Sequence, residues 1–240
     1  MATNSSTPQR LYLMQVAHTL PTMMPVVAYL IQTGDGQNIL IDSGLPAYLP
    51  PDRVPPGQTP VIGKSVIEQL GELGLQPADI NLLICTHFDV DHAGHLGAFR
   101  NAEFIVQRAH YVHACSGERF ALTCSEWDRP DTRFRFVDGD TQLLPGLDLI
   151  ETSGHTLGHQ SVLVRLPETG PVLLAIDAVR DQSAFKPDRQ KGPQDEDEQA
   201  LNASTRKLLD LAEREKVSLV IFGHDGQQWQ ALKKAPEYYG

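Results

Sequence analysis

Four apolar segments of this chain each lead into a histidine or an aspartate, and this pattern constrains the fold more than any other feature. The four junctions are Ile84-Cys85-Thr86-His87, Ile150-Glu151-Thr152-Ser153-Gly154-His155, Ala175-Ile176-Asp177 and Phe222-Gly223-His224. Short, continuous apolar runs of this kind are typical of buried strands. Strands that end together bring the side chains that follow them together. The sequence therefore predicts a strand-rich fold with a polar site at one edge.

The densest group of polar residues follows the first of these strands. It reads Thr86-His87-Phe88-Asp89-Val90-Asp91-His92-Ala93-Gly94-His95. Imidazoles and carboxylates beside a buried strand are costly unless they bind something. In a turn, side chains two positions apart can converge on one ion while Asp91 and His92 reach a second. A mixture of imidazole and carboxylate suits zinc, iron or manganese, so this segment predicts a centre that can hold two metals.

Strands and helices alternate along the rest of the chain. Residues 26–32 and 38–41 are β-rich apolar runs joined by Thr33-Gly34-Asp35-Gly36-Gln37, which is hairpin chemistry. Apolar residues at helical spacing predict helices near residues 66–73 and 201–212. The proline-rich segment 45–57 predicts a surface lid or rim. The acidic run 195–198 is interpreted as a solvated helix N-terminus without a function.

The charge balance argues against two classes of partner. Twenty basic and thirty acidic residues give a formal charge of −10, which opposes binding to nucleic-acid phosphates or to anionic membranes. No apolar run approaches the ~18 residues of a membrane helix, and the first residues do not resemble a signal peptide. We therefore expect a cytoplasmic protein that forms one domain over residues 1–240 and acts on a small molecule. A homodimer is possible, because the sequence does not determine the oligomeric state.

The order of the metal-type motifs resembles that of the metallo-β-lactamase superfamily. The motifs are His-x-Asp-x-Asp-His at residues 87–92, Gly-His-Thr-x-Gly-His at 154–159, an apolar strand ending in Asp177, and Gly223-His224. The resemblance covers residues 11–226. Within that superfamily, the run 151–161 and the segment Val106-Gln107-Arg108-Ala109-His110-Tyr111 are most similar to the N-acyl homoserine lactonase group. The fold that this implies is an α+β, four-layer αβ/βα sandwich in which two mixed sheets are flanked by helices.

The resemblance also implies a role for individual residues. His87, Asp89 and His155 would hold one metal, Asp91, His92 and His224 would hold the other, and Asp177 would bridge them. Asp42 matches an early strand-end aspartate that supports the ligands, although a turn-forming aspartate is the alternative. His159 and His95 are candidates for hydrogen bonds to the ligands, whereas His18, His110 and His113 are expected to be ordinary surface or helix residues.

The activity implied by the resemblance is metal-dependent hydrolysis of a lactone, in particular ring opening of an N-acyl homoserine lactone, which is quorum quenching. Two divalent ions, with zinc expected, would hold a bridging hydroxide that attacks the carbonyl. Asp91 would orient that hydroxide or pass its proton to the leaving alkoxide. Hydrolysis of another small ester, thioester or organophosphate is an alternative. A di-iron redox or oxygen-handling protein and a non-catalytic metal-bound sensor are alternatives of a different class.

Two positions depart from the lactonase pattern. That pattern has a histidine where this chain has Asp89, and a carboxylate oxygen there favours iron, manganese or cobalt as alternatives to zinc. The pattern also has a tyrosine shortly after the bridging aspartate, where this chain has Arg180. Arg180 could donate a hydrogen bond to the substrate in place of that tyrosine, and a surface salt bridge is the alternative. The acyl-chain length and the native metal are not determined by the sequence.

Overall fold

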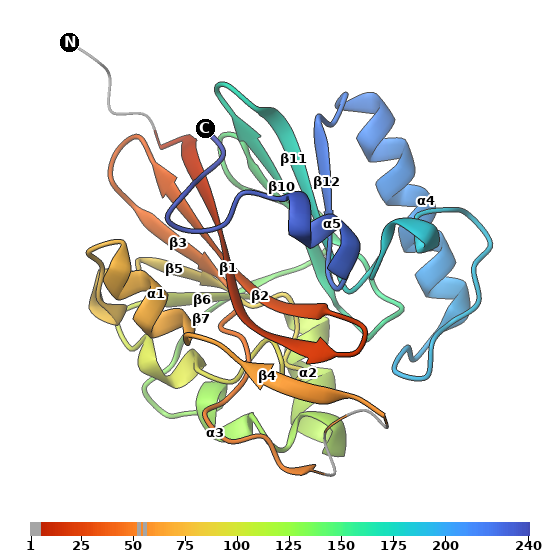
Figure 1. Ribbon diagram of the computed structural model, residues 1–240, viewed down its shortest axis with the longest axis horizontal. Helices are drawn as coiled ribbons and strands as arrows, with labels where there is room; N and C mark the ends of the chain where they lie inside the picture. Colours follow the sequence, from red (N-terminus) through yellow and green to blue (C-terminus); the bar gives the residue numbers. More distant parts are fainter. Residues whose placement is uncertain (1–5, 52–53, 55–56) are drawn as a thin grey trace.

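Two β-sheets lie face to face at the centre of the computed structural model, which describes residues 6–51, 54 and 57–240 (Figure 1). Within these residues one sheet has seven strands in the order β4-β1-β2-β3-β5-β6-β7, and the other has five in the order β12-β11-β10-β9-β8. The strands are β1 Pro8–Leu20, β2 Met24–Thr33, β3 Asn38–Ile41, β4 Thr59–Ile62, β5 Leu82–Ile84, β6 Glu103–Gln107, β7 Arg133–Val137, β8 Thr141–Leu144, β9 Leu147–Glu151, β10 Gln160–Leu166, β11 Gly170–Ile176 and β12 Leu219–Phe222.

Both sheets are mixed. In the first sheet β4, β1, β2 and β3 pair antiparallel, and β3, β5, β6 and β7 pair parallel. In the second sheet β8 to β11 pair antiparallel, and β12 joins β11 in parallel. The predicted hairpin between residues 26–32 and 38–41 is therefore confirmed as β2 and β3.

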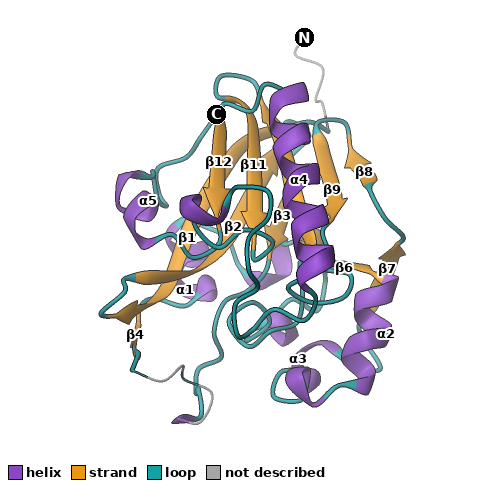
Figure 2. Ribbon diagram, turned by 90° about the vertical axis from the view of Figure 1, so that its right-hand side faces the viewer, coloured by secondary structure: helices purple, strands orange, loops and turns teal. Residues whose placement is uncertain are grey.

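Most helices cover the outer faces of the two sheets, whereas the last one packs Trp229 into the apolar cluster between the sheets (Figure 2). The helices are α1 Val66–Glu72, α2 Arg108–Ser116, α3 Cys124–Trp127, α4 Glu198–Arg214 and α5 Gly226–Ala231, with short 3-10 turns at η2 Pro77–Asp79, η3 Leu96–Ala98, η4 Glu118–Phe120 and η5 Gln182–Ala184. Helices α1, α2 and α3 contribute Val66, Ala114 and Trp127 to the apolar cluster on the first sheet, whereas α4 packs Leu208 and Leu211 against the second. This arrangement confirms the predicted four-layer αβ/βα sandwich.

The central strands are buried on both faces, which explains their continuous apolar sequences. In β2, Val27, Tyr29 and Ile31 face the second sheet, while Ala28 and Leu30 face the helices on the other side. Side chains alternate between the two faces of a strand, so each face needs its own apolar set when both are covered. The metal-type residues lie beyond the ends of these strands, where the apolar sequence stops.

The proline-rich segment is only partly described, because residues 52–53 and 55–56 lie outside the described residues. Leu45, Leu49 and Val54 line a cavity that also includes Asp91 and His224. The described part of the segment thus forms one side of the entrance to the strand-end cluster, in agreement with the predicted rim. In the described part of the chain, no helix combines the length and the apolarity that crossing a bilayer requires.

Candidate metal centre

Four loops carry the seven side chains that the sequence analysis assigned to metal binding, and each loop follows a strand. The loop after β5 carries His87, Asp89, Asp91 and His92, and the loops after β9, β11 and β12 carry His155, Asp177 and His224. The structure brings all seven together in three overlapping groups whose ligand atoms lie within 4.8 Å of one another. These groups are His87, Asp89 and His155; Asp91, His92 and His224; and His87, His92 and Asp177.

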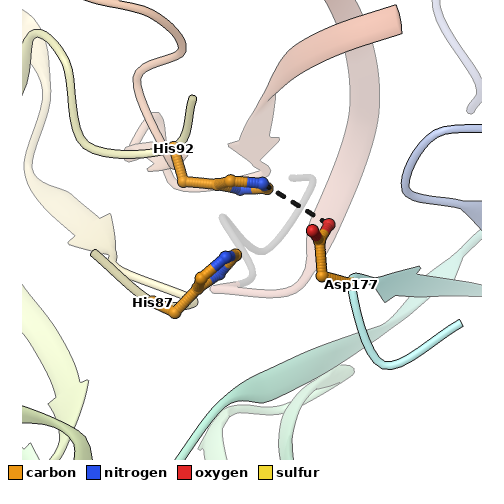
Figure 3. Close-up of side chains that lie close together, drawn as sticks. All are labelled: His87, His92 and Asp177. Carbon is orange, nitrogen blue, oxygen red and sulfur yellow. Dashed lines mark ion pairs between the residues drawn. The ribbon is translucent and has the colours of Figure 1, made fainter. Parts of the chain in front are cut away.

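Asp177 lies between the two outer groups. Its Oδ2 atom is 3.0 Å from His224 Nε2 and 3.5 Å from His155 Nε2, and its Oδ1 atom is 3.4 Å from His92 Nε2. Figure 3 shows the rings of His87 and His92 and the carboxylate of Asp177 converging on one point, with the His92 to Asp177 contact drawn as a dashed line. Asp177 is thus placed to contact ligands from both sides of the cluster.

Three buried atoms at this point have no hydrogen-bond partner among the described residues. They are His87 Nε2, His92 Nε2 and Asp177 Oδ1. A buried polar atom without a partner is costly, and most such atoms in proteins are satisfied by a neighbour, water or an ion. Imidazole nitrogens together with a carboxylate oxygen are the donor set that zinc and related divalent metals prefer. The residues present therefore fit a pair of divalent cations.

Hydrogen bonds on the outer nitrogen of each ring orient the histidines. His92 Nδ1 lies 2.8 Å from Asp42 Oδ2, and Asp42 also accepts hydrogen bonds from the backbone and hydroxyl of Thr86. His224 Nδ1 donates to the carbonyl of Pro25 at 2.9 Å. With Nδ1 engaged in this way, Nε2 keeps a free lone pair that points into the cluster. Asp42 is 1 % exposed, and its hydrogen bonds to His92 and Thr86 make its side chain a buried support of His92.

His159 lies directly behind the cluster. Its ring centroid is 5.0 Å from that of His87, and its Nε2 accepts a 3.3 Å hydrogen bond from the backbone of Asp177. The hydroxyl of Thr152 contacts its Nδ1 at 2.9 Å. Both nitrogens therefore have partners within the protein, and His159 belongs to none of the three candidate ligand groups. Its contacts are those of a residue that supports the Asp177 loop.

Burial and mutual interactions set the charges of the cluster. Burial lowers the pKa of His87 well below its ordinary value, and the neighbouring His92 adds to this effect. Although burial opposes it, the imidazoles of His224 and His92 hold the pKa of Asp177 well below the ordinary range. Burial also opposes the ionised form of His155, but hydrogen bonds with Asp195 and Asp89 raise its pKa to about 9. An ionised Asp177 and a neutral His87 are the forms that bind a metal ion.

Asp195 is a site residue that the sequence analysis missed. Its Oδ1 lies 2.8 Å from His155 Nδ1, so it orients His155 as Asp42 orients His92. The interpretation of residues 195–198 as only a solvated helix N-terminus is therefore wrong for Asp195, whose side chain is 3 % exposed. It holds for Asp197, which caps α4 by accepting a hydrogen bond from Ala200. No local signal distinguishes the two, because Asp195 meets His155 only through the fold.

We expect replacement of Asp195 by asparagine to weaken cation retention and turnover by about 10- to 100-fold, the usual effect of removing a partner of a metal-binding histidine. The reason is that an amide loses the charge that orients and polarises His155. Metal content after dialysis against a chelator and kcat/KM of the loaded protein would measure the effect. Asp210→Asn is the matched control, because Asp210 is an exposed residue of α4. Equal losses in both variants would contradict the assigned role.

Arg119, in η4, is a second residue that the sequence analysis missed. Its Nε and Nη2 atoms lie 2.7 Å and 2.5 Å from the two carboxylate oxygens of Asp89, so the pair is bidentate. Nothing in the spacing of the two residues indicates this contact, because 30 positions separate them. Asp89 also lies 3.0 Å from His155 Nε2 and 3.3 Å from His87 Nε2.

Arg180 lies at the edge of the cluster. Its guanidinium contacts Met24 Sδ at 3.1 Å and Gln194 Oε1 at 3.4 Å. Across the described ranges it takes part in no ion pair, so the alternative of a surface salt bridge is not supported there. Arg180 and His224 both line a largely apolar cavity of about 430 Å³. A second cavity of about 470 Å³ opens on Asp89, Asp91 and Arg119.

His110 joins the loop after β5 to the loop after β9. Its Nε2 accepts a 2.9 Å hydrogen bond from the backbone of Phe88, and its Nδ1 donates to the carbonyl of Leu157 at 2.9 Å. His110 lies in α2, so the expectation of a helix residue is confirmed, but the alternative of a surface residue was wrong because the side chain is fully buried. Burial lowers its pKa to about 4. Protonation would place a hydrogen on Nε2, where the Phe88 N–H already points.

We expect this buried neutral histidine to make folding stability depend on pH. The unfolded chain takes up a proton here near pH ~6.5 and the folded chain does so only near pH 4, so stability is full above the first value and falls as the pH drops toward the second. The loss amounts to about 3 kcal/mol. Urea unfolding of chelator-treated wild type and His110→Gln between those pH values would measure it. The same slope in both proteins would rule His110 out as the cause.

Comparisons with known proteins agree with this geometry. The sequence profile of the metallo-beta-lactamase superfamily matches residues 21–224. An N-acyl homoserine lactonase from a Bacillus species is 35% identical over 224 residues, which cover 90% of this chain and 87% of the relative. The N-acyl homoserine lactonase AttM of Rhizobium johnstonii is also 35% identical, with 90% and 88% coverage. A solved N-acyl homoserine lactone hydrolase with the product N-hexanoyl-L-homoserine at its catalytic metal centre has a TM-score of 0.83, 28% identity, and coverage of 97% of this chain and 100% of its own.

Proposed function

Because this chain belongs to the metallo-β-lactamase superfamily, we propose that it is a metal-dependent hydrolase that opens the ring of N-acyl homoserine lactones. The observation that carries the proposal is the convergence of four imidazoles and three carboxylates on one buried point, where three of their atoms have no hydrogen-bond partner among the described residues. The lactonase identity of relatives that match nearly the whole chain supports the substrate class. The activity is that of a quorum-quenching enzyme, and the matched region acts as one domain.

We assign the ligands to two sites. The first site consists of His87, Asp89 and His155, and the second consists of Asp91, His92 and His224. Asp177 contacts histidines of both sites and would bridge them. Zinc suits both sites, and iron, manganese or cobalt suit the first because Asp89 offers a carboxylate oxygen. Cations bound there would polarise the lactone carbonyl and lower the pKa of a water molecule enough to supply hydroxide at neutral pH.

Asp91 is the residue to which we assign proton transfer. Its side chain is 25% exposed, which is more than that of any other carboxylate in the two sites. It lines the cavity that opens on Asp89 and Arg119 and also the one that Leu45 and Leu49 border. Its Oδ2 lies 3.6 Å from His224 Nε2, so it remains close to the second site. A carboxylate in this place can accept a proton from the attacking water and return it to the alkoxide that leaves when the ring opens.

The space beside His224 and Arg180 suits the substrate. Met24 and His224 line both the cavity of about 430 Å³ and the narrower one that Leu45 and Leu49 border, and these adjoining, largely apolar spaces together would accept an acyl chain. Arg180 borders the same cavity and has no carboxylate partner in the described structure, so its guanidinium can donate to the substrate amide or to the carboxylate of the product. We therefore infer that Arg180 binds the polar part of the molecule.

A substrate panel tests the proposed function. Metal-loaded protein should open acyl homoserine lactones of short and long chain, giving a product that is one water heavier and carries a new carboxylate. Aryl esters, thioesters and phosphotriesters should be hydrolysed much more slowly. Efficient turnover of phosphotriesters or thioesters with every lactone left intact would overturn the proposal. Chelator-treated protein, with activity restored by added zinc, is the control for metal dependence.

A further inference from the structure

One guanidinium lies against the first of the two proposed metal sites. Arg119 donates through Nε to Asp89 Oδ1 at 2.7 Å and through Nη2 to Asp89 Oδ2 at 2.5 Å. A bidentate arginine–carboxylate pair of this kind is short, geometrically specific and strongly held. The pair is also largely sheltered, because the side chains of Arg119 and Asp89 are 24% and 16% exposed. The carboxylate of Asp89 is therefore paired with a fixed positive charge, which also contacts Glu196 through Nη1.

The remaining donors of Arg119 fix its position. Nη1 lies 3.2 Å from the carbonyl of His155, 2.9 Å from that of Gln194 and 3.2 Å from Glu196 Oε1. The Nε, Nη1 and Nη2 groups all have acceptors, so the guanidinium fork is held on three sides. These contacts also tie η4 to the loop that carries His155 and to the segment before α4. The charge cannot move away from Asp89 without breaking several hydrogen bonds.

The charge of Arg119 acts on the atoms that would hold the first cation. Nη2 lies 2.9 Å from His155 Nε2, and that nitrogen lies 3.0 Å from Asp89 Oδ2. The guanidinium is thus in direct contact with atoms that would hold the first cation. At such distances a full positive charge and a divalent ion repel each other strongly, even at the effective dielectric of a protein.

The second site has no comparable neighbour. In the ion pairs of the described residues, Asp91 and Asp177 contact histidines only. Asp89 is thus the one carboxylate of the three that is matched by a permanent cation within the described chain. A carboxylate with its own arginine contributes an oxygen to a metal site and adds almost no net charge, which is how a neutral histidine behaves.

We propose that Asp89 and Arg119 act as one charge-balanced unit. Arg119 is a positioning residue that holds Asp89 toward the first site. Its charge also lowers the affinity of that site for cations to the affinity expected with a neutral ligand in place of Asp89. This inference rests on the proposed function only through the ligand set. It predicts that the two residues are coupled. Removing the arginine alone leaves an excess negative charge at the first site, whereas removing the carboxylate alone leaves an excess positive charge.

A double-mutant cycle with Arg119→Gln, Asp89→His and the combined variant tests the proposal. The measured quantity is the affinity of each protein for zinc and for manganese, by competition with a chromogenic chelator and without any lactone. Arg119→Lys keeps the positive charge but cannot form the bidentate pair with Asp89, so it separates the effect of the charge from the effect of the pair's geometry. Arg108→Gln is the matched control, because Arg108 forms an exposed pair with Asp138 away from the cluster. Circular dichroism of each protein checks the fold.

Of the two metal ions that each chain binds, the more weakly bound one should bind at least about tenfold more tightly to Arg119→Gln, because a repelling charge is lost. Asp89→His alone should bind it at least about tenfold more weakly, and the combined variant should return close to wild type. Arg119→Lys keeps the charge, so its cation affinity should lie closer to wild type than that of Arg119→Gln, and Arg108→Gln should match wild type. Weaker binding in Arg119→Gln, or independent effects of the two substitutions, would overturn the proposal. Neither result depends on lactone turnover, so failure of the proposed function would be seen separately, as cation-loaded wild type that leaves lactones intact.

Discussion

Replacing Asp177 by asparagine should lower kcat/KM for lactones by at least about 1,000-fold, which corresponds to about 4 kcal/mol of lost transition-state stabilisation. The carboxylate approaches His92, His155 and His224, so it is the one side chain placed to serve both proposed sites. An amide has a single acceptor oxygen and no charge, and it cannot bridge two cations. The metal content should fall from about two ions per chain to one or fewer.

The measurements are elemental analysis after gel filtration and steady-state kinetics with a saturating supply of zinc. Asp188→Asn is the matched control, because Asp188 is exposed and pairs with Arg206 away from the cluster. Circular dichroism should show the same secondary structure in both variants, since Asp177 lies beyond the end of β11. If Asp177→Asn kept two ions and the full turnover rate, Asp177 could not be the bridging ligand.

Replacing Gly94 by alanine should destabilise the folded protein by about 3 kcal/mol or more. A Cβ atom at this position would lie 2.0 Å from the backbone nitrogen of Pro46 and 2.2 Å from the carbonyl carbon of Leu45. Both contacts are with backbone, so no side chain can rotate away to relieve them. The loop that carries His92 would have to move away from the loop that follows β3.

That movement should also affect the metal centre. Gly94 donates a 2.8 Å hydrogen bond to Gly44, and Ser43 donates to the carbonyl of His92 at 2.7 Å. These bonds hold the two loops that bring Asp42 and His92 into contact. Urea unfolding of chelator-treated protein separates the loss of stability from the loss of metal. Cation retention, measured in parallel, should also fall.

Gly71→Ala provides the opposite control. Gly71 lies in α1, and a Cβ built on it meets no atom within 4 Å. Alanine is favoured over glycine inside a helix by up to about 1 kcal/mol, so this variant should be as stable as wild type or more stable. Equal unfolding midpoints for Gly94→Ala and wild type would show that the two loops can separate without cost.

Much of the fold could be predicted because its strands are covered on both faces. In β11, Val172, Leu174 and Ile176 face the first sheet, and Leu173 and Ala175 face α4. Such a strand must be apolar at every position, so its end is visible in the sequence as the first polar residue. This is why Asp177 could be identified before the structure, and His87 and His224 follow similar runs within three residues. His155 follows only the apolar pair Leu149-Ile150, because β9 also contains Asp148 and Glu151.

The residues around that cluster could not be identified in the same way. Asp195 contacts His155 across 40 positions of sequence, and Arg119 contacts Asp89 across 30. His110 was expected to be an ordinary surface or helix residue, and although it lies in α2, its buried ring joins two loops of the site. Hydropathy and residue spacing indicate contacts only between residues that lie within one or two helical turns of each other in the sequence.

The sequence by itself determined which strands are buried, where they end, and which imidazoles and carboxylates follow them, because these features depend on the order of neighbouring residues. The tertiary structure decided which residues support those side chains and which charges they meet. Asp42 pairs with His92, Asp195 with His155, and Arg119 with Asp89 only because two sheets and their loops pack against one another. These contacts fix the orientation and the charge of the cluster, and they depend on distances in space that no local pattern encodes.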